Sequence, residues 1–124
     1  MNDNGRILLL DDDRQVVGYL KNALEENGYA VTAATSGKQA LAYIEERIPD
    51  LLILDLDLKM PAPDVFDVLR SAHSRFPYLR ILVISGYLHG ALLEAARIFG
   101  AIATLEKPVT AQVLVGKVLQ VLGR

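Results

Sequence analysis

The stretch that decides the fold is Ile7-Leu8-Leu9-Leu10-Asp11-Asp12-Asp13, an apolar run that ends in three consecutive acidic residues. A run this short, closed by polar residues, is typical of a buried strand in a parallel sheet. Three later apolar runs also lead to a polar residue: Leu51-Leu52-Ile53-Leu54 to Asp55, Ile81-Leu82-Val83-Ile84 to Ser85, and Ala103-Thr104-Leu105 to Lys107. In an open α/β sheet the carboxyl ends of the strands form the ligand-binding edge, so we expect these residues to share one pocket.

Apolar runs alternate with helix-like stretches along the whole chain, which predicts β-α-β units around a parallel sheet. The expected strands are 6–10, 29–34, 50–54, 80–84 and 101–105. The expected helices are 13–27, 36–47, 64–76, 91–99 and 110–122, with Asp13, Ser36, Asp64 and Thr110 at their starts and Gly28 and Gly100 after two of their ends. The predicted fold is a three-layer α/β/α sandwich.

Length and composition limit the possible functions. The chain has 124 residues, of which 52% are hydrophobic, and a formal net charge of −2, so we expect one soluble domain over residues 1–124. It has no cysteine, which excludes thiol catalysis and thiolate metal sites. Without a basic excess, a signal-peptide pattern or a long apolar stretch, we expect no direct contact with nucleic acid or membrane and a cytoplasmic location.

The residues at the predicted strand ends favour phosphoryl chemistry. Asp11, Asp12 and Asp55 would repel one another in one pocket unless a hard divalent cation and a lysine balanced their charge. Lys107 is placed to supply that positive charge, and Ser85 adds a hydroxyl that can bind an oxyanion. The sequence therefore predicts a phosphoacceptor site.

At this point the chain resembles the receiver domain of bacterial response regulators over nearly its whole length. The pieces that carry the resemblance are Ile7-Leu8-Leu9-Leu10-Asp11-Asp12-Asp13, Gly28-Tyr29, Gly37-Lys38-Gln39-Ala40-Leu41, Pro49-Asp50-Leu51-Leu52-Ile53-Leu54-Asp55, Ile84-Ser85-Gly86, Phe99-Gly100-Ala101 and Glu106-Lys107-Pro108-Val109. Their order and spacing make the match specific. It implies a flavodoxin-like sheet in strand order 2-1-3-4-5 and a Mg²⁺-dependent transfer of a phosphoryl group to an aspartate. The donor would be a sensor histidine kinase or a phosphotransfer protein.

The resemblance also implies a role for each site residue. Asp12 would ligate Mg²⁺ directly and Asp11 through water, with Asp55 and the backbone carbonyl of Asp57 as further ligands. Ser85 and Gly86 would bind the phosphoryl group and start the conformational change, together with Lys107. The bond before Pro108 is a candidate cis peptide.

Such a protein catalyses only its own phosphorylation and dephosphorylation, so we do not expect an enzyme in the ordinary sense. We expect a stand-alone regulator or phosphorelay intermediate, monomeric or weakly dimeric, that controls a partner protein by changing its conformation. One departure from the family pattern concerns this switch, because Thr104 stands where many receivers carry an aromatic residue.

Two aspartates compete for the acceptor role. Read forward from Gly28, the family pattern leads without a gap to Asp55, whereas Asp57 fits the Asp-x-x-Met-Pro pattern that ends at Pro61. A two-residue insertion after the third strand would reconcile the two readings. Asp55 is favoured, because a strand ending at Asp57 would bury an unpaired Asp55 inside the sheet. Asp57 would then lie in a solvated loop.

Two other functions stay open from the sequence alone. The segment Leu52-Ile53-Leu54-Asp55-Leu56-Asp57 resembles the Asp-x-Asp motif of haloacid dehalogenase-type phosphatases, although too few residues follow it for the rest of that fold. The chain could also be a receiver-like binding module that ignores phosphate. The retained set of Asp11, Asp12, Asp55, Ser85 and Lys107 argues against that module.

Overall fold

The computed structural model describes residues 4–86 and 90–123. Five parallel strands form one sheet in the order β2-β1-β3-β4-β5, as the family resemblance implied. The strands are β1 (Gly5–Leu10), β2 (Tyr29–Ala34), β3 (Leu51–Asp55), β4 (Arg80–Ser85) and β5 (Ala101–Glu106). The helices are α1 (Arg14–Glu26), α2 (Gly37–Glu46), α3 (Val65–Arg75), α4 (Gly90–Ile98) and α5 (Ala111–Leu122). The predicted three-layer α/β/α sandwich is confirmed.

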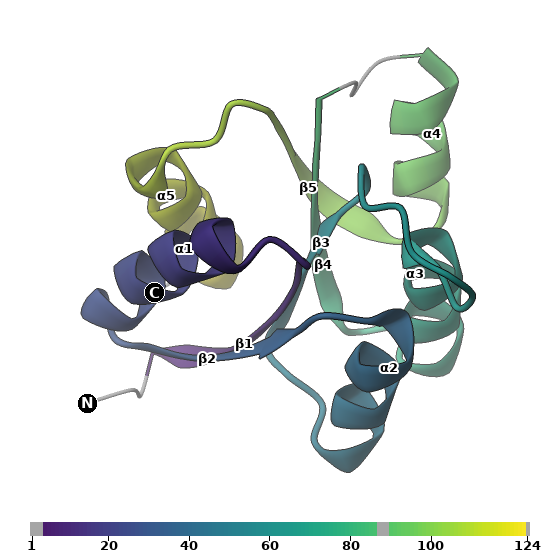
Figure 1. Ribbon diagram of the computed structural model, residues 1–124, viewed down its shortest axis with the longest axis horizontal. Helices are drawn as coiled ribbons and strands as arrows, with labels where there is room; N and C mark the ends of the chain where they lie inside the picture. Colours follow the sequence, from purple (N-terminus) through teal and green to yellow (C-terminus); the bar gives the residue numbers. More distant parts are fainter. Residues whose placement is uncertain (1–3, 87–89, 124) are drawn as a thin grey trace.

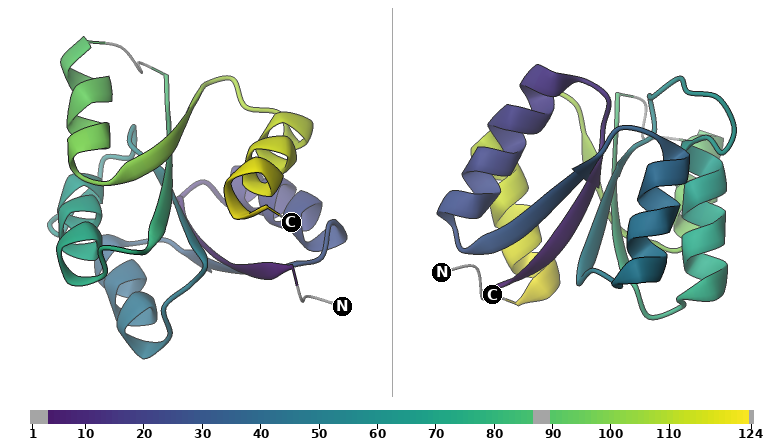
Figure 2. Two further views of the ribbon diagram at one scale, coloured as in Figure 1. Left: turned by 180° about the vertical axis from the view of Figure 1, so that it is seen from behind. Right: turned by 60° about the horizontal axis from the view of Figure 1, so that its bottom comes forward.

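The layers are seen directly in Figure 1, where α1 and α5 cover one face of the sheet and α2, α3 and α4 the other. The two further views in Figure 2 show the same division. Alternation along each strand supplies a separate core to each face. On β1, Ile7 and Leu9 pack toward α1 and α5, whereas Leu8 and Leu10 pack toward α2 and α3. The same alternation runs along β3.

The helix boundaries follow from side-chain capping. Asp13, Ser36, Asp64 and Thr110 each accept a backbone N–H in the first turn of the helix that follows, so the four predicted N-caps are confirmed. Asp64 forms a full capping box with Asp67. Gly28 (φ 90°) and Gly100 (φ 105°) adopt left-handed conformations after α1 and α4, which let the chain turn into the next strand.

Two strand ends differ slightly from the expectation and affect the site. Asp55 and Ser85 are the last residues of β3 and β4, where they had been expected just beyond them. Asp55 pairs with Ile84, and Ser85 pairs with Glu106 of β5. The sheet therefore fixes the backbone of both residues. Among the described residues, no helix combines the length and the apolar character needed to cross a bilayer.

Candidate functional site

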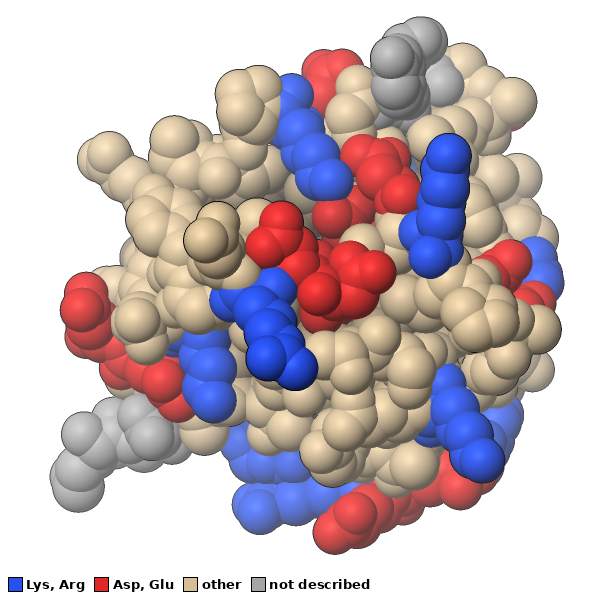
Figure 3. Space-filling view, in the orientation of Figure 1, with Lys and Arg blue, Asp and Glu red and all other residues tan. Residues whose placement is uncertain are grey.

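A pocket of about 660 Å³ opens at the carboxyl edge of the sheet, where β1, β3, β4 and β5 end. One part is charged and the other is apolar, with side chains from α1, β4 and the segment after β5. Its lining comprises Asp11, Asp12, Asp13, Val16, Leu20, Asp55, Asp57, Leu58, Ile84, Lys107, Pro108 and Val109. Acidic side chains gather at the centre of the face drawn in Figure 3, with basic side chains around them. The structure thus brings the predicted site residues to one place.

Asp55 lies at the base of this pocket and is 7% exposed. Strand alternation turns its side chain toward the α1/α5 face, on the same side as Leu51 and Ile53. One carboxylate oxygen, Oδ2, accepts a hydrogen bond from Lys107 Nζ at 2.8 Å. The other, Oδ1, accepts the backbone N–H of Asp57 at 2.9 Å. Asp55 therefore ends its strand and pairs with Lys107, as predicted.

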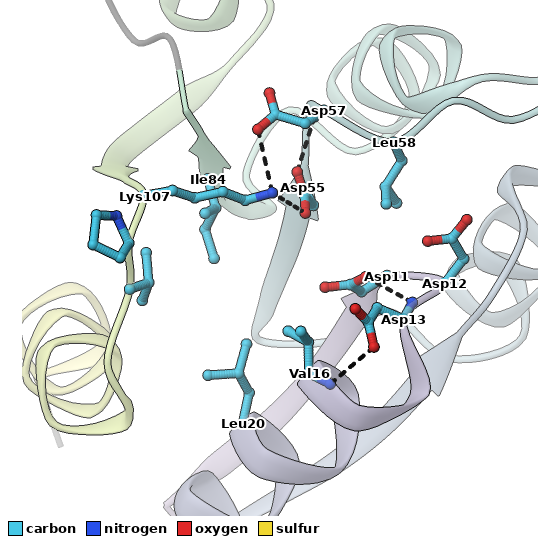
Figure 4. A pocket seen from close by; sticks show the side chains of 12 residues that line it. Asp11, Asp12, Asp13, Val16, Leu20, Asp55, Asp57, Leu58, Ile84 and Lys107 are labelled. Atoms are coloured by element: carbon cyan, nitrogen blue, oxygen red, sulfur yellow. Dashed lines mark hydrogen bonds and ion pairs between the residues drawn. The ribbon is translucent and has the colours of Figure 1, made fainter.

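Lys107 lies just beyond the end of the edge strand β5, and its side chain extends into the pocket toward Asp55 (Figure 4). Its backbone N–H donates to the carbonyl of Ser85 at 2.9 Å, and the bond from Lys107 to Pro108 is cis, as predicted. Partial burial works to lower the pKa of Lys107. The hydrogen bonds and charges of Asp55 and Asp57 outweigh that effect, so the pKa of Lys107 is raised. Lys107 is therefore a firmly protonated cation at neutral pH.

Asp57 lies in the turn after β3 and is exposed, as the sequence predicted. The sequence did not predict the contacts of its carboxylate, which lines the pocket with the side chain 34% exposed. Oδ1 accepts the hydroxyl of Ser85 at 2.6 Å, and Oδ2 accepts the backbone N–H of Gly86 at 2.8 Å. Lys107 Nζ lies 3.2 Å from Oδ2. Partial burial works to raise the pKa of Asp57, but the hydrogen bonds from Ser85, Gly86 and Lys107 outweigh it, so the pKa is lowered.

The loop after β3 holds Asp57 in this position by backbone contacts. Leu56 N–H donates to the carbonyl of Ile84 at 2.8 Å, which extends the contact between the chain after β3 and β4 by one residue. Farther on, the loop crosses the start of α2, where an added Cβ at Gly37 would collide with the carbonyl oxygen of Pro63. The bond from Ala62 to Pro63 is cis, which the sequence analysis did not predict. The lengthened loop is thus packed against the domain.

Ser85 is fully buried, at 0% exposure. Its hydroxyl was expected to bind the phosphoryl group, and in the structure it donates to Asp57. The segment that follows, from Gly86 to Gly90, was expected to move with Ser85, but its residues 87–89 lie outside the described residues. Ser85 and Gly86 nevertheless present the two donors predicted for an oxyanion.

The opposite wall of the pocket is acidic. Asp11 is 4% exposed and accepts the backbone N–H of Asp13 at 3.0 Å. Burial is the main cause that raises the pKa of Asp11, and the charges of Asp55 and Asp12 add to it. The N–H of Asp13 and the charge of Lys107 oppose this shift without cancelling it. Asp12 is exposed at the mouth of the pocket, whereas Asp13 faces its helix as the N-cap.

This wall fits a partly hydrated Mg²⁺. Among the described residues, no three His, Cys, Asp or Glu side chains form a ready-made metal cage. Mg²⁺ does not need one, because it keeps several waters and uses one or two carboxylates. A buried carboxylate with a raised pKa, next to Asp55 and below the exposed Asp12, provides such oxygen ligands and favours a cation. The donor set is therefore suited to a hard divalent ion.

Most of the sequence matches one protein family. The family model described as "Response regulator receiver domain" matches residues 7–119. The response regulator MprA of Mycobacterium leprae (strain TN) is 35% identical over 119 residues, which are 96% of this chain and 51% of that protein. The alginate biosynthesis transcriptional regulatory protein AlgB of Pseudomonas aeruginosa is 32% identical over 104 residues, 84% of this chain and 23% of AlgB. This chain thus spans about half of MprA and less of AlgB.

Solved structures show the same likeness. A CheY-like response regulator receiver domain protein from Methanospirillum hungatei JF-1 superposes with a TM-score of 0.87 at 30% identity, covering 95% of this chain and 93% of that one. NtrX from Brucella abortus, crystallised with ADP, gives a TM-score of 0.84 at 30% identity and covers 96% of this chain and 27% of NtrX. The family match contradicts the phosphatase interpretation of the segment around Asp55. The chain belongs to the response regulator receiver domain family of two-component signalling.

Proposed function

We propose that this domain is a cytoplasmic, phosphorylation-controlled switch and that Asp55 is its phosphoacceptor. The observation that carries the proposal is the contact of 2.8 Å between Asp55 and Lys107 at the base of an acidic pocket. A carboxylate held at a strand end, beside a protonated lysine and open to solvent through the pocket, can reach an incoming phosphorus atom. Asp57 lies beyond the strand, and its carboxylate is directed toward Ser85 and Gly86.

The transfer forms one bond and breaks another. A carboxylate oxygen of Asp55 attacks the phosphorus of a phosphohistidine on the donor protein and forms an acyl phosphate. The P–N bond breaks, and its electron pair stays on the imidazole nitrogen of the donor. Lys107 balances the negative charge on the phosphoryl oxygens as the new bond forms. Mg²⁺, held by Asp11, Asp12, Asp55 and the backbone carbonyl of Asp57, would add a second positive charge beside these oxygens.

The proposed partners are a sensor histidine kinase or a phosphotransfer protein upstream and an effector protein downstream. The domain modifies only itself, so its output is a change of shape that we assign to the segment after Ser85. Relatives such as AlgB are named as transcriptional regulators and are much longer than this chain. For this domain we propose protein contacts, without direct contact with nucleic acid, and a monomeric or weakly dimeric state.

Phosphorylation by a small donor tests the acceptor assignment. The protein is incubated with acetyl phosphate, with and without Mg²⁺, and its intact mass and peptides are measured by mass spectrometry. We expect one acid-labile phosphoryl group, dependent on Mg²⁺, on the peptide that contains Asp55. Asp55→Asn should abolish it, whereas Asp57→Asn, the matched control two residues away, should keep most of it.

Two results would contradict the proposal. A phosphoryl group mapped to Asp57 would reverse the assignment of the acceptor. If neither acetyl phosphate nor beryllofluoride modifies the protein in the presence of Mg²⁺, the chain is instead a binding module that ignores phosphate.

A further inference from the structure

Three donors from two places in the chain converge on the carboxylate of Asp57. They are the hydroxyl of Ser85 at 2.6 Å, the backbone N–H of Gly86 at 2.8 Å and the ammonium of Lys107 at 3.2 Å. The same ammonium also lies 2.8 Å from Oδ2 of Asp55. An anion held by a hydroxyl, an amide and an ammonium is bound as an oxyanion ligand would be.

These donors are the groups that the proposed function assigns to the phosphoryl group. A phosphoryl group on Asp55 would offer its oxygens to Ser85, Gly86 and Lys107, but each of them already contacts Asp57. A hydroxyl has a single proton, and a backbone amide has a single N–H. Ser85 and Gly86 therefore cannot donate fully to Asp57 and to a phosphoryl oxygen at the same time.

We propose that the Asp57 side chain is an internal ligand of the phosphoryl-binding groups, which a phosphoryl group on Asp55 must displace. The inference rests on the proposed function, because it needs Asp55 as the acceptor. It assigns a regulatory role to a side chain that the sequence presented only as the alternative phosphoacceptor.

The exchange is possible because the carboxylate of Asp57 can move into solvent. Its side chain is one-third exposed, so rotation would move the carboxylate into water. Lys107 would keep its contact of 2.8 Å with Asp55 during the exchange. The phosphoryl group brings more negative charge and three acceptor oxygens, against the single charge and two oxygens of a carboxylate. It can therefore replace Asp57 at a site that weaker anions would not enter.

The internal ligand also means that the phosphoryl-binding donors are already occupied in the unphosphorylated protein. Ser85 and Gly86 already donate to a carboxylate that lines the pocket, before any phosphoryl group is present. Phosphorylation would then exchange one anion for another at these donors and release the loop that carries Asp57. The conformational signal would come partly from the displaced loop between β3 and α3.

The first test needs no phosphorylation. Proton–nitrogen NMR spectra of the unphosphorylated protein report the Gly86 amide, which a hydrogen bond to a carboxylate shifts downfield. Asp57→Ala should move this resonance upfield, and Asp57→Asn, which keeps an acceptor oxygen, should move it less. The matched control is Glu106→Gln, which removes one negative charge from an exposed neighbour of Lys107. It should leave Gly86 unchanged.

The second test measures competition directly by titrating beryllofluoride, a phosphoryl analogue, in the presence of Mg²⁺. If the internal contact fills about nine-tenths of the population, Asp57→Ala should bind beryllofluoride about tenfold more tightly than the wild type. Asp57→Asn should lie between them, because its amide has the shape of the ligand without its charge. The affinity of Glu106→Gln for beryllofluoride should stay within about twofold of the wild-type affinity, because the loss of a nearby exposed charge does not free the donors that Asp57 occupies.

The outcomes separate this inference from the function beneath it. An unchanged Gly86 resonance in Asp57→Ala would overturn the internal contact. Beryllofluoride binding that is equal in the wild type and Asp57→Ala, or equally improved in Glu106→Gln, would overturn the competition while Asp55 stays the acceptor. If no variant binds beryllofluoride, the proposed function fails, and the displacement fails with it.

Discussion

The two sides of Asp55 differ in how their charges are balanced. On the side of β4 and β5, Lys107, Ser85 and Gly86 all contact carboxylate oxygens, and two aspartates share one ammonium group. On the side of β1, Asp11 is buried with a raised pKa, and no salt bridge between described residues reaches it or Asp12. Both sides are built from polar residues at strand ends.

This difference indicates that the β1 side favours binding of a cation, whereas the β4/β5 side favours binding of an anion. The β1 side has negative charge in excess, so it gains from a cation. The β4/β5 side has donors that are already occupied, so a new anion gains only by replacing the carboxylate of Asp57. Metal binding would therefore add an interaction, whereas phosphorylation would exchange one.

The largest effect is expected from Lys107→Ala, which removes an ammonium group that contacts both Asp55 and Asp57. Phosphorylation by acetyl phosphate should slow by about 100-fold, because the charge that balances the phosphoryl oxygens is lost. Intact-mass time courses measure this rate. Lys117→Ala, at a half-buried lysine of α5 that does not line this pocket, is the charge-matched control and should phosphorylate at the wild-type rate. Equal rates for Lys107→Ala and wild type would remove Lys107 from the mechanism.

Among the charged side chains around the pocket, those after β1 should matter most for Mg²⁺ binding. Asp12→Asn should weaken Mg²⁺ binding by about tenfold or more, because an exposed carboxylate ligand loses its charge. Asp13→Asn is the matched control: it removes the adjacent charge but keeps an N-cap side chain, since asparagine caps helices as well as aspartate. Isothermal titration with MgCl₂ compares them. If both variants lose the same affinity, the site responds only to total charge and Asp12 is no ligand.

A smaller effect is expected from Ser85→Ala on the occupied side. The substitution removes the hydroxyl that donates to Asp57 at 2.6 Å but leaves the donors of Gly86 and Lys107 in place. The free energy of unfolding should fall by about 1 kcal/mol, measured by urea denaturation. Phosphorylation should persist, since Asp55 keeps its contact of 2.8 Å with Lys107 when the hydroxyl is removed.

The conformational output of the wild type and of Ser85→Ala is measured by amide hydrogen exchange with and without beryllofluoride. The wild type should change across residues 85–99, and the variant should lose most of that change. Changes confined to other parts of the chain would refute this route.

The smallest effect concerns Asp11 and pH in the absence of metal. The pKa of Asp11 is raised in the folded state, so the folded protein binds this proton more tightly than the unfolded chain does. Its contribution to stability is therefore present at low pH and is lost as pH rises through the raised pKa. Asp11→Asn cannot ionise and keeps an oxygen that can accept the N–H of Asp13, so it escapes this loss.

Thermal unfolding in chelator tests this sign. The advantage of Asp11→Asn over the wild type should grow from pH 4 to pH 7. Asp12→Asn, at an exposed position, should show a smaller increase in thermal stability over the wild type across this pH range. An advantage that shrinks toward pH 7 would contradict the assigned cause.

The sequence alone determined the fold and most of the site. Strands and helices were predicted within about one residue at most boundaries, because apolar runs, capping side chains and glycines are local signals. The N-caps at Asp13, Ser36, Asp64 and Thr110 all formed as expected. The pocket was predictable because parallel strands bring their carboxyl ends to one edge, whichever loops connect them.

Only the tertiary structure decided where the side chain of Asp57 points. Its loop has no periodic pattern, and its path depends on the close approach of Pro63 to Gly37 and on the hydrogen bond from Leu56 to Ile84. These contacts join residues far apart in the chain, so no local rule contains them. A charged loop side chain commonly points away from the protein, but here three donors held near strand ends orient the carboxylate of Asp57 although its side chain is one-third exposed.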